Sequence, residues 1–247
     1  MKARMILFAL GAAGLATVTI AGARGIPPAG AYHGAYGEVL NAVAVGERKA
    51  TDVVSAVNFD YRGLDTLGEE FILFASVIAV SAILRKQEDE EEDESEDHWE
   101  PRKAPDSDAV RVLAVMLVPL MVCFGIYMVT SGAVSPGGGF QGGVVLATAP
   151  LLVYLCAHAK SYLRIAPPPL VKGGEAVGAA GYALVGILGL FAGKAFLENV
   201  VPLGSAGEAW SGGTIFLLNL TVGVAVAAGF VELLSVFVEE VLRKETK

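Results

Sequence analysis

Six apolar stretches, each close to the length of a membrane-spanning helix, divide this chain of 247 residues. A helix needs about 20 mainly apolar residues to cross the hydrocarbon core of a bilayer. The last two stretches exceed that length, so their helices should tilt or extend beyond the lipid. The predicted spans are Met5–Ala23, Leu67–Leu84, Val112–Ser131, Gly142–Ala159, Ala176–Val201 and Gly213–Leu242.

The composition agrees with a protein that lies in a lipid bilayer. Hydrophobic residues make up 54% of the chain, charged residues make up 18%, and the mean hydropathy is +0.57. Soluble domains of this size usually carry about a quarter charged residues. The sequence therefore predicts an all-α fold, a polytopic membrane protein with six transmembrane helices.

The net charge of −8 comes from one acidic tract. Of the 26 acidic residues, twelve lie between Glu88 and Asp108, and this segment holds only two basic residues. Such a tract repels itself and buries little apolar surface, so we interpret it as a solvated linker. The alternative is a docking segment for a partner. No basic surface indicates binding to nucleic acid.

The cysteine and histidine residues show no pattern of a site. Cys123 and Cys156 fall in separate predicted helices, and His33, His98 and His158 are scattered along the chain. There is no Cys-x-x-Cys spacing, Ser-His-Asp pattern or phosphate loop. We expect free, buried thiols, no metal site, no cofactor and no enzyme chemistry within this chain.

Two interpretations fit the first apolar stretch. Lys2 and Arg4 precede it, and the small residues 21–23 near its end resemble the cleavage site of a secretory signal peptide. We expect the stretch to remain as the first transmembrane helix.

Basic residues gather in the loops on one side of the six predicted spans. The positive-inside rule makes this side cytoplasmic, so both termini and the acidic tract are predicted to be cytoplasmic. These basic residues are Lys2, Arg4, Arg85, Lys86, Arg102, Lys103, Arg111, Lys160, Arg164, Lys172, Arg243, Lys244 and Lys247.

A glycine-rich run joins the third and fourth predicted spans. Each Gly costs about 1 kcal/mol relative to Ala inside a helix, so the run indicates positive φ angles or the close approach of a backbone or ion. One interpretation is a tight turn fixed by Pro136, followed by close helix packing at Gly142 and Gly143. The other is a broken helix end that lines a hydrated cavity. The run is Pro136-Gly137-Gly138-Gly139-Phe140-Gln141-Gly142-Gly143.

Three motifs resemble one family of ion transporters. The glycine run, followed by an apolar helix, resembles the PGGGF-x-GG element of the B subunit (MnhB) of Mrp/Mnh-type multisubunit sodium/proton antiporters. Residues 217–224 are similar to the LLNxxVGV stretch of that subunit. Residues 58–69 resemble the DFRGFDTLGE element in the C-terminal extension of the large A subunit, which is also a separate small subunit in membrane-bound hydrogenase complexes.

This resemblance implies two modules and a function. Residues 1–87 would form a two-helix module like the A-subunit element, 88–108 the acidic linker, and 109–247 a four-helix MnhB-like module. The implied function is a non-catalytic subunit of a cation/proton antiporter in a prokaryotic cytoplasmic membrane, acting with other membrane subunits on Na⁺ and H⁺. The alternative is the same module in a redox-driven complex such as a membrane-bound hydrogenase.

Two positions depart from the family pattern. Relatives usually carry a His in a GH-x-x-PGGGF arrangement, whereas Gly132 is followed here by Ala133. The last span often has a charged residue after its VG element, where Ala225 and Val226 stand in this chain. The ion specificity of relatives is therefore not carried over.

Ionisable side chains beside the second span are candidates for an ion path, because an unpaired charge in hydrocarbon costs several kcal/mol. Asp60, Arg62, Asp65 and Glu69 crowd this position. Arg62 can pair with a carboxylate, and neighbouring acids raise each other's proton affinity. Thr66 and Glu69 also fit a capping box, so capping and ion transport are alternative roles of Glu69.

Three further candidates lie in the last two spans. Glu232 is about 16 Å along its helix from Arg243, near mid-membrane, where it either pairs with a neighbouring subunit or belongs to a proton route. Glu175 begins the fifth span, where a helix N-terminus stabilises negative charge. Lys194 and Glu198 suit a local ion pair, although Lys194 could instead complement an acidic residue of another subunit.

Overall fold

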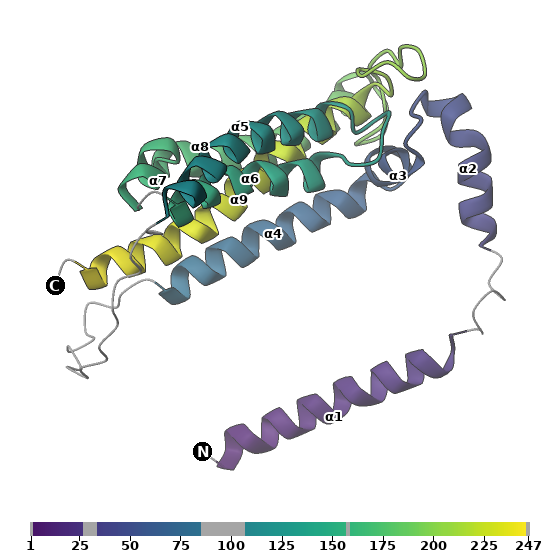
Figure 1. Cartoon of the computed structure of the whole chain (residues 1–247). Coiled ribbons are helices and arrows are strands. Elements are labelled where there is room, and N and C mark those ends of the chain that lie inside the picture. The colour runs from purple at the N-terminus through teal and green to yellow at the C-terminus, as the bar shows by residue number, and fades with distance from the viewer. Residues whose placement is uncertain (1, 27–33, 85–106, 157–158, 246–247) are drawn as a thin grey trace. The chain divides into compact units, whose positions relative to one another are not determined.

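The computed structural model describes residues 2–26, 34–84, 107–156 and 159–245. Within these ranges every regular element is helical (Figure 1). Nearly all of the predicted acidic linker, residues 88–106, lies outside the described residues.

Five helices are long and apolar enough to cross a membrane: α4, α5, α6, α8 and the part of α9 up to Phe237. A shorter apolar helix, Ala9–Arg24, lies in the first predicted span. The prediction of an all-α, polytopic membrane protein is confirmed. The elements are α1 (Lys2–Arg24), α2 (Ala35–Arg48), α3 (Val53–Ala56), the π-helix η1 (Val57–Tyr61), α4 (Gly63–Leu84), α5 (Asp108–Thr130), α6 (Gly139–Cys156), α7 (Ala159–Ile165), α8 (Pro168–Phe191) and α9 (Thr214–Glu245).

The chain forms two compact units, Met1–Val39 and Leu40–Lys247. The first contains α1, whose described side chains are exposed. The second contains all five helices that are long and apolar enough to cross a membrane, and all of the sites below lie in it.

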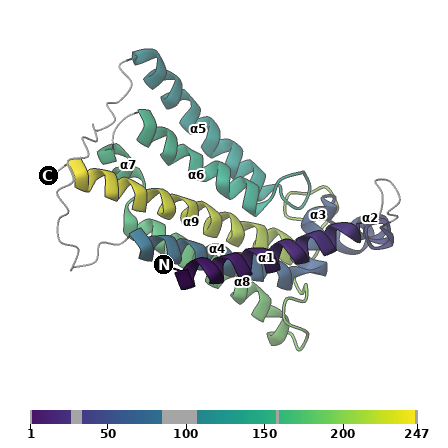
Figure 2. The ribbon, with the colours of Figure 1, turned by 90° about the horizontal axis from the view of Figure 1, so that it is seen from below.

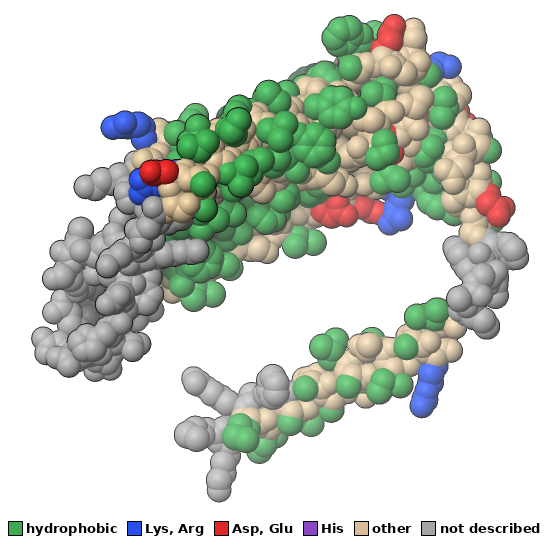
Figure 3. Space-filling model, in the orientation of Figure 1, with side chains coloured by type: hydrophobic (Ala, Val, Ile, Leu, Met, Phe, Trp, Pro, Cys, Tyr) green, Lys and Arg blue, Asp and Glu red, His purple; other side chains and the backbone are tan. Residues whose placement is uncertain are grey.

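Helix α9 is the centre of the second unit. It packs against α4, α6 and α8, and α5 packs mainly against α6; Figure 2 shows α9 running between α6 on one side and α4 and α8 on the other. Of the 18 most apolar consecutive residues of α9, 61% are buried, compared with 11% to 28% of those in the other four spans. The surface around these helices is largely apolar (Figure 3), as a lipid or subunit environment requires.

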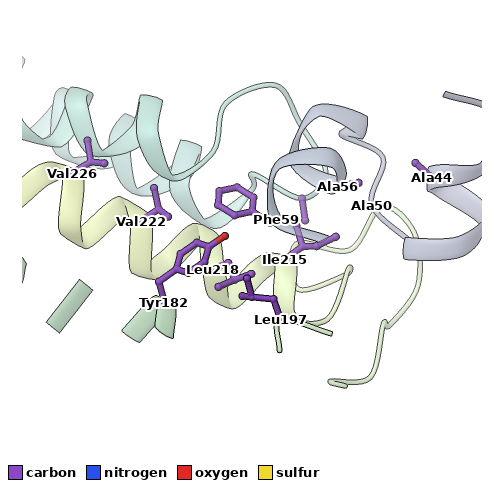
Figure 4. Close-up of a cluster of buried hydrophobic side chains, with 11 residues drawn as sticks. Ala44, Ala50, Ala56, Phe59, Tyr182, Leu197, Ile215, Leu218, Val222 and Val226 are labelled. Carbon is purple, nitrogen blue, oxygen red and sulfur yellow. The ribbon is translucent and has the colours of Figure 1, made fainter. Parts of the chain in front are cut away.

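A buried core joins the N-terminal part of this unit to its last helices (Figure 4). Ala44 from α2 and Phe59 from η1 pack in the same cluster as Tyr182 from α8 and Ile215 from α9. The rings of Phe59 and Tyr182 lie 6.4 Å apart between centroids. Segments separated by more than a hundred residues therefore share one core at the end of the unit where α4 and α9 begin.

Helix α8 differs from the predicted fifth span at both ends. It begins at Pro168 rather than Ala176, because proline is well suited to the first helical turn. It stops at Phe191, well before Val201. Gly193 follows with a φ of +73°, the left-handed conformation typical of a helix C-terminus, and Lys194 N–H donates to the Gly189 carbonyl.

The capping prediction at the second span is wrong. Helix α4 begins at Gly63, so Thr66 lies inside it, and its hydroxyl donates to the Asn58 carbonyl at 2.8 Å. The π-helix that precedes α4 brings that carbonyl within reach. The cysteine prediction is half right: both thiols are free, but Cys123 is exposed on the chain surface and Cys156 is only half-buried.

The glycine run forms a turn that leads directly into α6. Gly137 and Gly138 have φ angles of +142° and +114°, which an L side chain rarely adopts. A Cβ on Gly139 would lie 2.6 Å from the Asn219 carbonyl, and one on Gly143 would lie 2.8 Å from Val226 Cβ. These contacts with α9 are what the packing interpretation of the run requires.

Asn219 of α9 fixes the turn in place. It is fully buried. Its Oδ1 accepts a hydrogen bond from Gly139 N–H at 2.8 Å, and its Nδ2 donates to Ser55 Oγ at 2.9 Å and to the Ile215 carbonyl at 3.0 Å. One side chain thus connects the glycine run, α3 and α9.

We expect Asn219→Ala to destabilise the protein. The change leaves the buried N–H of Gly139 without a partner, and each buried group stranded in this way costs about 1–3 kcal/mol. A lower thermal unfolding midpoint in mild detergent checks this prediction. Asn41→Ala, which changes an exposed asparagine of α2, is the matched control. Equal midpoints for the two variants would contradict the role of Asn219.

Candidate functional site

Three carboxyl groups meet where α4, α8 and α9 pack together. Glu70 of α4 and Glu175 of α8 are only 4% and 7% exposed, and Glu232 of α9 is half-buried. Gly229 lies one turn before Glu232 in α9, and a Cβ there would lie 3.5 Å from Glu175 Oε1 and 3.8 Å from Leu73 Cδ2, one turn after Glu70 in α4, so the three carboxyl groups lie close together. We call these three residues the carboxyl cluster.

The surroundings of the carboxyl cluster are apolar. Gly229 of α9 lies beside it, and a Cβ there would be in ordinary van der Waals contact with Glu175 Oε1 and Val77 Cγ2, each at 3.5 Å. One oxygen of each carboxyl group is buried without a hydrogen-bond partner. Among the described side chains, no Lys or Arg forms a salt bridge with any of the three.

This arrangement limits the charge that the carboxyl cluster can carry. An ionised carboxylate in an apolar interior is costly unless a positive charge or several donors face it. Two adjacent carboxyl groups lower that cost when they share one proton. The cluster is therefore suited to holding and releasing a proton or a cation, and ill-suited to staying fully ionised.

The structure brings together two residues that the sequence placed in separate spans, Glu175 and Glu232. The helix-end interpretation of Glu175 is wrong, because α8 begins at Pro168 and Glu175 lies about two turns inside it. Sequence reasoning missed Glu70 as a candidate. The buried positions Gly63, Thr66 and Glu70 of α4 follow helical spacing, and this phase is the signal that could have found it.

Glu69 lies on a different face of α4. It is exposed, and it borders a small cavity of about 120 Å³ with Arg62, Asp65 and Thr66. Arg62 Nε donates to Asp65 Oδ2 at 2.6 Å, so the predicted pairing of Arg62 with a carboxylate is present. Since the capping role is excluded, the exposed carboxylate of Glu69 is free to face another subunit.

A larger polar cavity, which we call the vestibule, lies at the end of the unit where α4 begins. Its volume is about 640 Å³, and residues of η1, α4 and the segment after α8 line it. Asp60 forms its buried floor. The carboxylate pairs with Arg48 Nε at 2.7 Å and accepts a hydrogen bond from Asn199 Nδ2 at 2.8 Å.

Two further polar contacts involve residues that line the vestibule. Tyr61 donates to Glu47 Oε2 at 2.7 Å; burial and the Glu47 carboxylate raise the pKa of Tyr61 to about 12. Lys194 Nζ pairs with Glu198 Oε1 at 3.1 Å, which is the local ion pair predicted from their spacing. The hydrogen bond from the Ala195 N–H holds the pKa of Glu198 below its usual value, and Lys194 adds a smaller effect in the same direction.

Comparison with known proteins identifies the family of this chain. Residues 109–232, half of the chain, match the family described as "Domain related to MnhB subunit of Na+/H+ antiporter". The uncharacterized protein MJ1307 of Methanocaldococcus jannaschii is 34% identical over 195 residues, which cover 71% of this chain and 72% of that protein. The putative antiporter subunit mnhB2 of Staphylococcus haemolyticus is 34% identical over 93 residues; the match covers 37% of this chain and 65% of that protein, slightly less than two thirds.

Two solved structures share the fold. A chain of the membrane-bound sulfane sulfur reductase, an archaeal respiratory membrane complex, is similar with a TM-score of 0.69 and 27% identity over 95% of this chain and 98% of that chain. A chain of the Mrp complex from Dietzia sp. DQ12-45-1b is similar with a TM-score of 0.68 and 22% identity. This second match covers 96% of this chain but 26% of that chain, and it shows a likeness of fold alone.

The chain belongs to the family of domains related to the MnhB antiporter subunit. It is a multi-pass membrane subunit of the Mrp type, a type also found in respiratory membrane complexes. The resemblance stated from the glycine run and residues 217–224 is confirmed.

Proposed function

We propose that this chain is a non-catalytic subunit that carries protons within an Mrp-type ion-translocating complex. The observation that supports this proposal is the carboxyl cluster. Glu70, Glu175 and Glu232 lie within the membrane-spanning helices and have buried, unpartnered oxygens. Ionisable groups at this depth mark ion or proton routes in membrane proteins.

The lining of the carboxyl cluster favours the proton over Na⁺ as its ligand. Hard cations need a shell of several oxygen ligands. A Cβ on Gly229 would contact Glu175 Oε1 together with the aliphatic side chains of Val77 and Leu73, so apolar groups border this carboxyl group. A proton needs only one acceptor oxygen, and a neighbouring carboxylate supplies it. Na⁺ would then be handled elsewhere in the complex.

A second candidate setting is a redox-driven complex. The chain aligns with 98% of one chain of the sulfane sulfur reductase complex, but with only 26% of the matching Mrp chain. This coverage favours a place like that chain's, in a respiratory membrane complex. The antiporter setting rests on the match of residues 109–232.

The module organisation and orientation are part of the same proposal. Residues 1–87 form a module like the A-subunit element, 88–108 a cytoplasmic linker, and 109–247 the MnhB-like module, with both termini cytoplasmic. Within the second unit, α4, α6 and α9 begin, and α5 and α8 end, at the same end (Figure 1), and the basic residues near the opposite end favour a cytoplasmic location for that opposite end. The vestibule then opens on the outer side.

Gentle purification from the native membrane, followed by identification of the accompanying subunits, tests the proposal. We expect a large heteromeric complex, because the chain leaves apolar helix faces uncovered and has few charges for a complete path of its own. Iron–sulfur or nickel–iron subunits would assign the redox setting, and antiporter subunits alone would assign the other. A stable monomer or homo-oligomer that transports ions would refute the proposal.

A further inference from the structure

An apolar groove lies between α5 and α6, near the end of the unit where α5 begins. Its volume is about 330 Å³, and it is partly open at its side. Its lining in α5 follows the spacing of one helical face, and apart from one arginine the whole lining consists of aliphatic side chains and a thiol. We call it the α5–α6 groove; it is lined by Arg111, Ala114, Val115, Val118, Leu152, Val153 and Cys156.

Close packing at the other ends of the two helices explains why the groove is there. A Cβ on Gly125 would lie 3.0 Å from the Gly142 carbonyl oxygen, and one on Gly142 would lie 2.9 Å from the Gly125 carbonyl oxygen. Arg111 is about 21 Å along α5 from Gly125, and Cys156 is about 21 Å along α6 from Gly142. Figure 2 shows the two helices farther apart at that end. The side chains there leave a gap that the glycine contact closes elsewhere.

The groove lies in a part of the protein that faces either lipid or another subunit. Both helices are long and apolar enough to cross a membrane, and Val115 on the groove wall is 72% exposed. A partner helix is about 10 Å across, so it would lie over a groove of this volume and not within it. A flexible hydrocarbon chain can enter the groove and contact both walls, and such chains are the medium around α5 and α6.

Arg111 gives the groove a charged end. It is the fourth residue of α5 and is exposed. Among the described residues it forms no salt bridge, and this includes Asp108 one turn earlier. The helix dipole does not explain an arginine here, because positive charge is stabilised at helix C-termini. A guanidinium suits phosphate, which it binds through parallel N–H donors, and basic pockets between transmembrane helices bind anionic lipid head groups.

We propose that the α5–α6 groove is a binding site for one anionic phospholipid. One hydrocarbon chain of the lipid lies along Ala114, Val118 and Leu152, and Arg111 binds the phosphate and selects a headgroup of net negative charge. In the proposed orientation this lipid belongs to the cytoplasmic leaflet. The site does not depend on the proton role of the carboxyl cluster.

Photo-crosslinking of the whole purified complex in lipid nanodiscs tests the site. The probes are phosphatidylglycerol and phosphatidylcholine that carry the same photoactivatable diazirine in one chain, and mass spectrometry locates the residues they label. We expect phosphatidylglycerol to label the groove residues of α5 and α6 at least about fivefold more than phosphatidylcholine does. One basic residue near an anionic lipid surface has an effect of this size.

Four variants separate the headgroup contact from the groove itself. Arg111→Gln should remove the preference for phosphatidylglycerol, and Arg111→Lys, which keeps the charge, should retain most of it. Lys172→Gln changes an exposed basic residue near the start of α8 and is the matched control, so it should leave the preference unchanged. Ala114→Leu fills part of the groove and should lower labelling there by both lipids.

Several results would overturn the site. Equal labelling by the two lipids in the unmodified complex would show that the groove takes chains without selecting a headgroup. A groove without adducts would show that another subunit covers it. Loss of the preference in Lys172→Gln as well as in Arg111→Gln would indicate a general effect of surface charge. A preference that appears only after deletion of residues 89–97 would make the acidic segment, and not a lipid, the partner of Arg111.

Discussion

Complexes that carry Glu175→Gln or Glu232→Gln are expected to assemble normally and to lose most of their ion-coupled activity. Gln retains the size of the side chain and donates a hydrogen bond, so it can replace the protonated member of the Glu175–Glu232 pair. It cannot release a proton. We expect at least about a hundredfold loss of proton-coupled transport, within the range that a lost proton-transfer group produces.

Yield of the complex and sodium- or proton-driven activity are the two measurements. Glu208→Gln in an exposed loop is the control, and it should match the unmodified complex in both. The double variant Glu175→Gln/Glu232→Gln should lose no more activity than either single variant, because residues that act as one unit are strongly non-additive. Loss of assembly in the single variants would indicate a structural pair, in which one buried partner is stranded. Normal yield with normal transport would refute the proton role.

Because Glu69 has no capping role in the structure, the variant Glu69→Gln tests only the charge of this side chain. The structure places Thr66 inside α4, so Glu69 does not complete a capping box. Any loss of activity in that variant with normal assembly would therefore report on the exposed carboxylate and on the subunit that faces it. The contribution of Asp60, Arg62, Asp65 and Glu69 to an ion path stays a prediction, and it concerns a different site from the carboxyl cluster.

Much of the fold follows from local sequence signals. Apolar length predicts five of the spans that the structure has, and Pro136 with the glycines that follow it predicts the turn before α6. Span limits are less predictable, because charged residues can lie inside a helix. The predicted fifth span begins after Glu175, but α8 begins at Pro168 and includes Lys172 and Glu175, and it ends before Gly193, within the predicted span.

The carboxyl cluster was only partly predictable, for a geometric reason. Glu69 and Glu70 are adjacent, and successive positions of a helix point about 100° apart. Which one faces the interior depends on the phase of α4, and its packing against α9 sets this phase. Glu175 and Glu232 come together through the contact between α8 and α9, which neither stretch reveals by itself.

The structure shows the surroundings of Ala133, which stands where the family pattern has a His. Relatives usually carry a His at this place before the glycine run, but here Ala133 is fully buried in the core cluster, and its carbonyl accepts from Asp52 N–H at 3.2 Å. No titratable side chain stands at that position. A proton route in this chain has to use other groups, and the carboxyl cluster lies in the same unit.

We expect Gly178→Ala to disturb the structure that holds the carboxyl cluster. Gly178 lies on the buried face of α8 between Glu175 and Tyr182. A Cβ there would lie 2.5 Å from the Ala225 nitrogen and 2.7 Å from its Cα. These are backbone atoms of α9 and cannot rotate away, so the two helices must separate. Overpacking of this kind costs about 1–3 kcal/mol or more.

Gly173→Ala is the matched control, on the same helix. A Cβ on Gly173 would meet nothing within 4 Å, and Ala favours helix over Gly by about 1 kcal/mol. The control should therefore be as stable as the unmodified protein or slightly more so. Thermal unfolding midpoints and yields of the purified complex compare the two variants. Gly178→Ala should be low in both, and because separation of α8 from α9 also moves Glu175 away from Glu232, complexes that do assemble should have low ion-coupled activity. Equal stability of the two variants would show that α8 and α9 are less closely packed than these contacts indicate.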